Sequence, residues 1–451
     1  MASIGTNYDP ATTAQALAES FTFGQQQILT RQSETAKAVE KALGTLGSAL
    51  SAFQTSLASL TGVNKTLSAN SATFSDTAFA SATATPSAAA GTYAFFVEQI
   101  ASSHKISYGG MTDFAGTGSM TLGVGAASFT IDLTAKTTWT VRDLAAAINS
   151  APGNTGLSAS VVTTGSTSEL VLSATATGAA NTISVSTSDT ADPALKTKLG
   201  VTPNLLSAPQ DAIVRIGSNT GTAITQATNT FNVIDGVTMT FTKAQAAGSA
   251  PVTLTVGADA SKTTANVQAF VDAYNKLKSS VDSLVSPGDP ANGAAAGAFS
   301  TDSGVRALRD RLISLVRGTG ATSLASYGII ANREGTLSVD STRLTKALAA
   351  NPTGLDTLIG SSASSAPTGI AGKLDTYLDI WTKSTTGQLG SRKSAVSKLQ
   401  TTLTDRQASL DRQYDSAYTR YLAQFTQLQS VQSSMSYNTS LFDNLFSSNN
   451  D

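Results

Sequence analysis

The chain has 451 residues, and only 13% of them are charged, about half of the roughly 25% that is typical of globular proteins. Its 29 basic and 30 acidic residues give a net charge of -1, so there is no overall positive charge to favour nucleic-acid binding. Cysteine is absent and His104 is the only histidine, which excludes disulfides, thiolate catalysis and metal sites built from cysteines or several histidines.

The N-terminal segment has the spacing of a coiled-coil helix. Its apolar residues recur in steps of four and three over about three heptads. They are Val39, Leu43, Leu46, Leu50, Phe53, Leu57 and Leu60. This seam predicts either an ordinary bundle helix or a helix that packs within an extended stalk. The first basic residue is Arg31, so we do not expect a secretory signal peptide.

Residues 84–257 alternate apolar and polar side chains with period two, which predicts a mainly β region. Asp235 and Gly236 separate two such runs and predict a two-residue hairpin turn, because glycine adopts a positive φ at little cost. The glycine clusters at 116–118 and 122–125 are interpreted as β-turns.

One helix is predicted inside this β region, from Thr140 to about Asn149. Thr140 and Asp143 have the spacing of a capping box, which satisfies two backbone N–H groups at a helix N-terminus. After the β region, Asp340 is predicted to cap a short helix.

Two further seams lie in the C-terminal half. The second consists of Val267, Phe270, Tyr274, Leu277, Val281 and Leu284. The third has two rows on one face, one formed by Val396, Leu403, Leu410, Ala417 and Val431, the other by Tyr414, Tyr421, Leu428, Met435 and Phe442. Seams from both chain ends can pack together, which brings the termini close to each other.

The last helical stretch, from Tyr421 to Phe446, is an apolar stripe with Asp443 as its only ionised side chain. A lone helix of this composition is predicted to be disordered in the monomer and to become ordered when several copies stack. This is typical of a self-assembling subunit. The residues expected to bind partners are Tyr421, Phe425, Leu428, Val431, Met435, Leu441 and Phe442.

Motifs of catalysis are missing from the sequence. It contains no P-loop, HExxH, EF-hand or GxSxG pattern. His104 is interpreted as a surface or strand-end histidine, and carboxylates such as Glu334 and Asp340 as caps or turn residues. We therefore expect no enzyme activity, no cofactor and no metal. Since no apolar run reaches roughly 18 residues, we also expect no membrane insertion.

Several segments, in order along nearly the whole chain, resemble the bacterial flagellar filament cap protein family, also called hook-associated protein 2. The first, Gly91 to Ala101, is similar to the family's Gly-x-Tyr-x-x-x-Val-x-x-Leu-Ala strand, with Ile100 in place of Leu. The others are 129–131 with 140–149, 229–231 with 235–238, 270–275, and 327–329 with 335–340.

The resemblance and the residue patterns together predict an α+β multidomain fold. A discontinuous, coiled-coil-like helical stalk comes from both chain ends and carries two mainly β head domains, one inserted in the other. The expected boundaries are flexible terminal helices at 1–42 and 411–451, the stalk at 43–83 and 258–410, the proximal head at 84–108 and 208–257, and the distal head at 109–207.

The resemblance implies a structural function. Copies of the chain would form a ring, a pentamer in the expectation from the family, at the distal tip of the filament. The ring would promote folding and insertion of exported flagellin and prevent its loss. The implied partners are further copies, flagellin and a flagellar export chaperone that binds the C-terminal stripe. The chain would leave the cell through the flagellar type III apparatus. Host glycans are a further expected ligand of the Ser/Thr-rich residues 109–207.

Two other classes of protein share some of these features. A hook–filament junction subunit would have coiled-coil termini and no cysteine, but not the ordered segments above. A secreted adhesin or carbohydrate-binding surface protein would also present a β head on a stalk. An enzyme would have to use His104, the single histidine.

Overall fold

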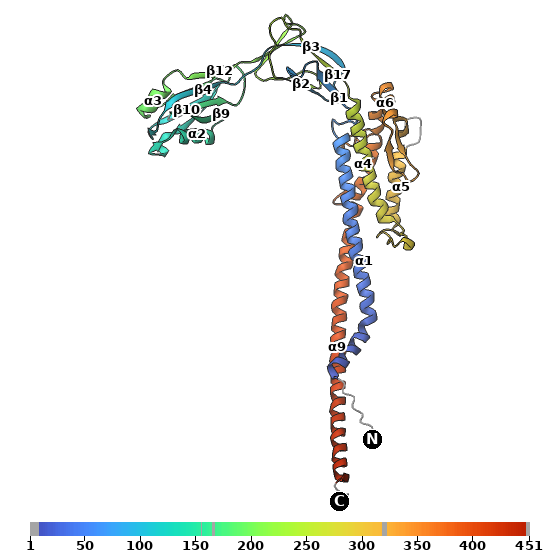
Figure 1. Ribbon diagram of the computed structural model, residues 1–451. Coiled ribbons are helices and arrows are strands. Elements are labelled where there is room, and N and C mark those ends of the chain that lie inside the picture. Colours follow the sequence, from blue (N-terminus) through green and yellow to red (C-terminus); the bar gives the residue numbers. More distant parts are fainter. Residues whose placement is uncertain (1–8, 155, 165–166, 318–322, 448–451) are drawn as a thin grey trace. The chain divides into compact units, whose positions relative to one another are not determined.

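The computed structural model describes residues 9–154, 156–164, 167–317 and 323–447 (Figure 1). The chain divides into two compact units. The helical unit contains residues 1–67 and 264–451, and the β unit contains residues 68–263. Each unit has its own buried apolar side chains.

Two long helices from the two chain ends, α1 (Pro10–Thr61) and α9 (Gln388–Ser447), lie side by side in the helical unit (Figure 1). Gln26 and Gln407 exchange amide hydrogen bonds of 3.2 and 2.9 Å, and Gln400 donates to Glu40 at 2.8 Å. Residue numbers rise along α1 as they fall along α9, so the two helices are antiparallel. The predicted pairing of the chain ends is confirmed.

The main core of the helical unit contains the first two predicted seams. Leu46 and Leu50 of α1 are fully buried with Val267 and Phe270 of α4 (Ala260–Val285). Helices α5 (Ser303–Arg317) and α8 (Gly369–Thr382) complete this core. The third seam packs outside this core. Its residues Leu403 and Leu410 on α9 are buried with Leu29 and Ala36 of α1 in a separate cluster.

Shorter elements of the helical unit connect these helices. Asp340 accepts a hydrogen bond from the backbone N–H of Arg343 at 3.0 Å and so caps the helix that follows, as predicted. The short elements are η2 (Pro290–Asn292), η3 (Leu324–Tyr327), β18 (Ile329–Ala331), β19 (Leu337–Val339), α6 (Ser341–Ala350) and α7 (Gly354–Ile359).

The β unit holds two separate cores. The first lies between a five-stranded antiparallel sheet and a three-stranded one. The five strands, in spatial order, are β1 (Asn70–Phe74), β17 (Val252–Ala258), β3 (Gly91–Gln99), β13 (Ala212–Ile216) and β14 (Ala223–Gln226). The three are β15 (Thr230–Ile234), β16 (Val237–Phe241) and β2 (Ala80–Ala84). Ile234 pairs with Val237, which confirms the predicted two-residue turn.

The second core is formed by residues between Ile106 and Leu199. One sheet has the order β12 (Asn204–Ser207), β4 (Lys105–Met111), β10 (Thr167–Ala174) and β9 (Leu157–Thr164). A three-stranded sheet has the order β11 (Ile183–Thr187), β6 (Ser119–Val124) and β7 (Ala127–Asp132). A two-stranded sheet pairs β5 (Phe114–Ala115) with β8 (Thr138–Trp139). The sequence of this core interrupts that of the first, so one mainly β part is inserted in the other.

Helical segments cover part of the second core. They are η1 (Leu133–Ala135), α2 (Val141–Ser150) and α3 (Pro193–Leu199). Helix α2 has the predicted capping box, since Thr140 and Asp143 bond each other's backbone N–H groups. The interpretation of 122–125 as a turn is wrong for Gly123, which lies inside β6, where it pairs with Ser184 and Ser128.

Residues 68–83 differ from the sequence-based expectation, which assigned them to the stalk. They contain β1 and most of β2, and Phe74 and Ala80 are buried in the first β core. Strand β1 pairs with β17, far along the chain, so local spacing gives no sign of it. The finer division into terminal helices, stalk, proximal head and distal head stays a prediction.

Candidate functional site

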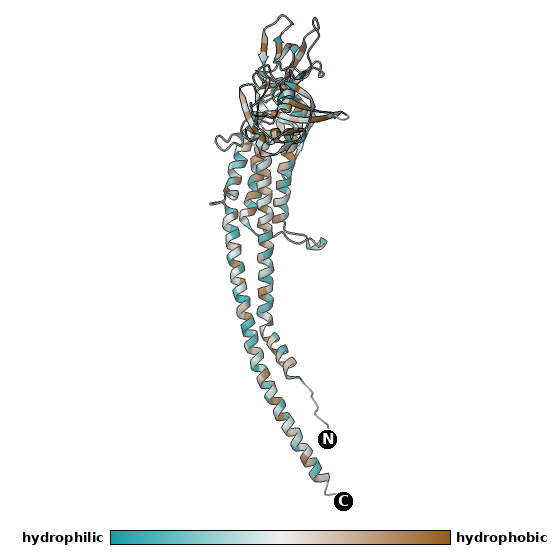
Figure 2. Ribbon diagram, turned by 90° about the vertical axis from the view of Figure 1, so that its left-hand side faces the viewer, coloured by the Kyte–Doolittle hydropathy of each residue, from teal (hydrophilic) through white to brown (hydrophobic). Residues whose placement is uncertain are grey.

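The C-terminal part of α9 leaves its large apolar side chains exposed. Every side chain from Thr426 to Asn444 is exposed. Figure 2 shows hydrophobic residues, in brown, recurring among hydrophilic ones along this part of the helix. Met435 is 65% exposed and Phe442 is 61% exposed. Exposed apolar residues at this density are typical of a surface that another protein covers.

Most of the predicted partner-binding residues share one side of α9. At about 100° of rotation per residue, six of them fall within an arc of roughly 120°. These six form what we call the terminal stripe: Tyr421, Phe425, Leu428, Val431, Met435 and Phe442. Leu441 was predicted with them, but it lies about 100° away from Phe442 around the helix. It is 43% exposed on a different side.

The terminal stripe begins where α9 passes the start of α1. Counting along both antiparallel helices from the Gln26–Gln407 and Glu40–Gln400 pairs places Pro10 opposite about residues 423 to 430. Consistent with this register, Tyr421 and Phe425 are half-buried, whereas Leu428 is 44% exposed. The stripe therefore extends past the described part of α1.

The N-terminal half of α1 carries exposed apolar residues that the sequence analysis missed. Its buried face uses small side chains, among them Ala14 and Ala18, so the two helices can approach closely there. Its larger side chains point elsewhere, because Leu17, Phe21 and Ile28 are 39%, 58% and 57% exposed. Their spacing of four and seven residues puts them on one helix face and could have revealed them.

A groove runs between α1 and α9 beside these residues. Its volume is about 470 Å³. Ile28, Val39, Val396 and Leu399 supply apolar side chains. The basic residues Arg31 and Arg406 also line it. A helix from another molecule could place apolar side chains in such a groove.

The single histidine of the sequence is accounted for by local structure. The Nδ1 atom of His104 accepts a hydrogen bond from the backbone N–H of Ile183 at 2.7 Å, and burial lowers the pKa of His104. This hydrogen bond ties the residue before β4 to the first residue of β11, which gives His104 a structural role. Across the described ranges, no group of three or more His, Cys, Asp or Glu side chains could hold a metal ion. In the same ranges, no helix has the length and apolar content to cross a membrane.

Comparison with known proteins covers most of the chain. Residues 209–437 match the family model of the flagellar hook-associated protein 2 C-terminus, and residues 6–104 match that of its N-terminus. Residues 119–176 match the flagellin hook IN motif.

Similar proteins agree with these matches. The lateral flagellar hook-associated protein 2 of Vibrio parahaemolyticus is 34% identical over 387 residues, which are 83% of this chain and 85% of that protein. The flagellar hook-associated protein 2 of Escherichia coli is 31% identical over 464 residues, 95% of this chain and 96% of that protein.

A solved structure is also similar. The crystal structure of the D1-D2-D3 domains of the flagellar cap protein FliD from Escherichia coli superposes with a TM-score of 0.60 and 27% identity, covering 79% of this chain and 99% of that chain. These similarities favour neither a hook–filament junction subunit nor a secreted adhesin. Matches at both ends of the chain, relatives aligned over most of its length and the shared fold all agree: the chain belongs to the flagellar hook-associated protein 2 family, the filament cap proteins of the bacterial flagellum.

Proposed function

We propose that the chain is a subunit of a homo-oligomeric cap, a pentamer, at the distal tip of the flagellar filament. The cap promotes folding and insertion of exported flagellin subunits and prevents their loss. Membership of the family supports this function. The task requires contacts that form and release rather than a covalent step, so we propose that the chain is not an enzyme and needs no cofactor.

The observation that carries the proposal is the exposed apolar surface of the terminal helices. Burying a Leu, Val, Met or Phe side chain contributes about 1.5–3 kcal/mol. Leu428, Val431, Met435 and Phe442 are 44–65% exposed, so much of this free energy is available to a partner. Between Tyr421 and Asn444 the sequence has one charged residue, Asp443, so little charge must be desolvated on binding.

We propose that the terminal stripe binds flagellin and further copies of the chain in the assembled cap, and an export chaperone before that. These partners use the same apolar side chains, so the chaperone must leave before the cap assembles. Leu441 takes part only if the partner wraps around the helix. Glycan binding by residues 109–207 stays a prediction, and its test is glycan binding before and after their deletion.

Deletion of the gene tests the capping function. We expect cells with hooks but without filaments, and monomeric flagellin in the medium. The readout is the ratio of flagellin in the medium to flagellin on the cells. Long, attached filaments in the deletion strain would contradict the capping function. Native mass spectrometry of the assembled cap counts the subunits, and any number other than a pentamer's contradicts that part alone.

Charge substitutions test the terminal stripe. In the deletion strain, we expect Leu428→Asp with Met435→Asp to fail to restore filaments, because two carboxylates would have to be buried against the partner. The matched control is Ser430→Asp with Ser434→Asp, on the opposite side of α9, which should restore them. Binding of the purified variants to the chaperone should show the same contrast. Normal filaments with the stripe variant would contradict the role of the stripe.

A further inference from the structure

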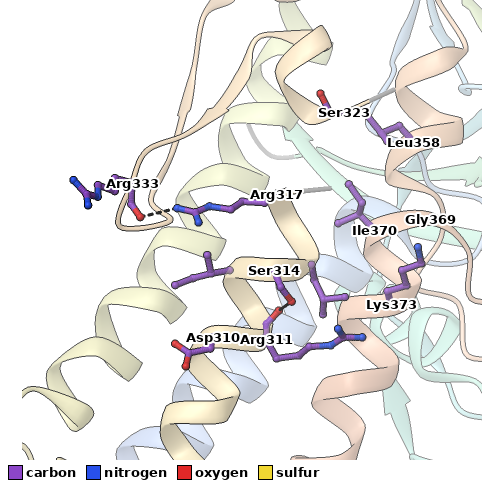
Figure 3. A pocket seen from close by; sticks show the side chains of 12 residues that line it. Asp310, Arg311, Ser314, Arg317, Ser323, Arg333, Leu358, Gly369, Ile370 and Lys373 are labelled. Atoms are coloured by element: carbon purple, nitrogen blue, oxygen red, sulfur yellow. Dashed lines mark hydrogen bonds between the residues drawn. The ribbon is translucent and has the colours of Figure 1, made fainter. Parts of the chain in front are cut away.

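A cavity of about 830 Å³ lies in the helical unit, lined by α5, α8 and the turn between β18 and β19 (Figure 3). Part of its lining is apolar. Ile370 is buried, and Ile313, Leu315 and Leu358 are half-buried. None of these residues belongs to the terminal helices, so the cavity is separate from the surface described above.

The same cavity has an excess of positive charge. Arg311, Arg317, Arg333 and Lys373 line it, against one carboxylate, Asp310. All four basic side chains are exposed. Asp310 is already engaged, because its carboxylate lies 2.9 Å from a guanidinium nitrogen of the neighbouring Arg309, outside the lining.

Three of these cations contribute charge to the cavity itself. Arg317 donates hydrogen bonds to the backbone oxygens of Asn332 and Arg333, at 3.0 and 2.6 Å, which hold the guanidinium in place without neutralising it. Figure 3 shows Arg311 directed from α5 toward α8, the helix that carries Lys373, whereas the side chain of Arg333 extends away. Among the described residues, Arg311 and Lys373 form no ion pair.

The cavity continues along α8. An adjoining hollow of about 390 Å³ shares Arg311, Gly369 and Lys373 with it and reaches Tyr377 and Ile380. Ile380 is 50% exposed. We call the two hollows together the α5–α8 groove. Arg311 and Lys373 lie in the part that both share, and each hollow adds apolar side chains.

We propose that the α5–α8 groove binds a short acidic segment, with apolar side chains, of a protein other than this chain. Carboxylates would pair with the unneutralised Arg311, Arg317 and Lys373, and apolar side chains of the segment would cover the apolar part of the lining. A free inorganic anion would leave the apolar lining uncovered. An extended segment of a second copy offers a poor complement, because no two carboxylates in this sequence are adjacent or separated by a single residue. A folded face of a second copy is distinguished by the sedimentation experiment below.

The test uses the full-length chain and a labelled peptide built from Glu, Leu and Ala, with fluorescence anisotropy as the readout. We expect binding that weakens with added salt, and affinity about tenfold lower for a matched peptide with Gln in place of Glu. Arg311→Glu with Lys373→Glu should lower the affinity for the acidic peptide by about tenfold or more.

The matched control is Arg306→Glu with Lys346→Glu, which changes the charge equally at exposed positions outside the groove. It should leave the affinity within about twofold. If the groove variant is poorly folded by thermal unfolding, Arg311→Gln with Lys373→Gln replaces it.

Four results would overturn the inference. If the groove variant and the control variant lose equal affinity for the acidic peptide, the peptide is bound by general surface charge and not by the groove. Equal binding of the Gln peptide would mean an apolar groove only, and displacement of the acidic peptide by inorganic phosphate at similar concentration would mean a simple anion site. Altered self-association of the groove variant in sedimentation velocity would mean that a second copy occupies the groove. The peptide assay involves no filament assembly, so its failure leaves the proposed cap function unaffected.

Discussion

Asp302 shows how one carboxylate can organise several helices of the cap subunit. Arg392 of α9 donates two hydrogen bonds to it, at 2.5 and 3.1 Å, and the backbone N–H of Val305 in α5 donates a third at 2.9 Å. The Arg392 guanidinium also lies 5.4 Å from the centre of the Trp381 ring on α8. The hydrogen bonds from Arg392, followed by that from Val305, hold the pKa of Asp302 below its usual 3.8.

Asp302→Asn should lower the free energy of unfolding by about 1 kcal/mol at pH 7, since both partners are under a third exposed and partly screened. A folded-state pKa below the unfolded value means that the stabilisation is present above about pH 4 and is lost as the pH falls through the folded-state pKa. The difference between wild type and variant should therefore shrink on acidification. Urea unfolding from pH 7 to pH 3 measures it, with Asp310→Asn as an exposed control. A difference that grows toward low pH would contradict the assignment.

Among the elements, the β15–β16 hairpin depends most directly on one residue type. Gly236 has φ of +72°, in the region that L side chains rarely adopt. Its backbone oxygen accepts a hydrogen bond from Thr85 at 2.8 Å, so the turn also holds the end of β2. A Cβ atom at this position would lie 2.5 Å from the Thr85 hydroxyl and 3.1 Å from the Ala88 backbone.

Gly236→Ala should destabilise the β unit by about 1–3 kcal/mol, from backbone strain and from the close contact with Thr85 and Ala88. Gly248→Ala separates the two causes, because Gly248 also has a positive φ, +83°, but a Cβ there would meet nothing within 4 Å. Chemical denaturation of both variants should show the larger loss for Gly236→Ala. Equal losses would mean that the contact contributes nothing.

At the scale of the whole molecule, the chain folds around separate hydrophobic cores. As a filament cap protein it acts outside the cell, at the distal end of the filament. The helical unit has one main core, and the β unit has two cores, the second of which interrupts the first in sequence. The terminal stripe contributes to none of them.

Separate cores predict separate unfolding transitions in scanning calorimetry. Leu50→Ala, at a fully buried position of the helical unit, should destabilise that unit by about 2–5 kcal/mol and leave the β unit unchanged. Leu172→Ala, equally buried in the second β core, should lower the unfolding temperature of the β unit and leave that of the helical unit unchanged. A single transition that both variants shift by the same amount would contradict this independence.

Features that depend on neighbouring residues could be predicted from the sequence alone. The seam through Leu46 and Leu50 follows from helical spacing, and the α2 cap follows from Thr140 and Asp143 lying three residues apart. The turn at Gly236 follows from its freedom to take a positive φ. The function could be inferred from the sequence because segments that resemble the family occur in the same order over nearly the whole chain.

Features that depend on pairing between distant residues were decided by the tertiary structure. Gly123 looked like a turn residue, but it lies in a strand because Ser128 and Ser184 pair with it on both sides. Phe21 and Ile28 of α1 are exposed because the small side chains on the neighbouring face, such as Ala18, are the ones that meet α9. Spacing along one helix cannot say which face a second helix will cover.

The α5–α8 groove depends on folding in the same way. Arg311 and Lys373 are separated by a long stretch of sequence, and each by itself looks like an ordinary surface cation. Packing of α5 beside α8 brings both to one apolar hollow. The sequence by itself determined the helices, turns and family of this protein, since local spacing and ordered motifs carry that information. Only the tertiary structure decided which side chains converge, because convergence depends on contacts between residues far apart in the chain.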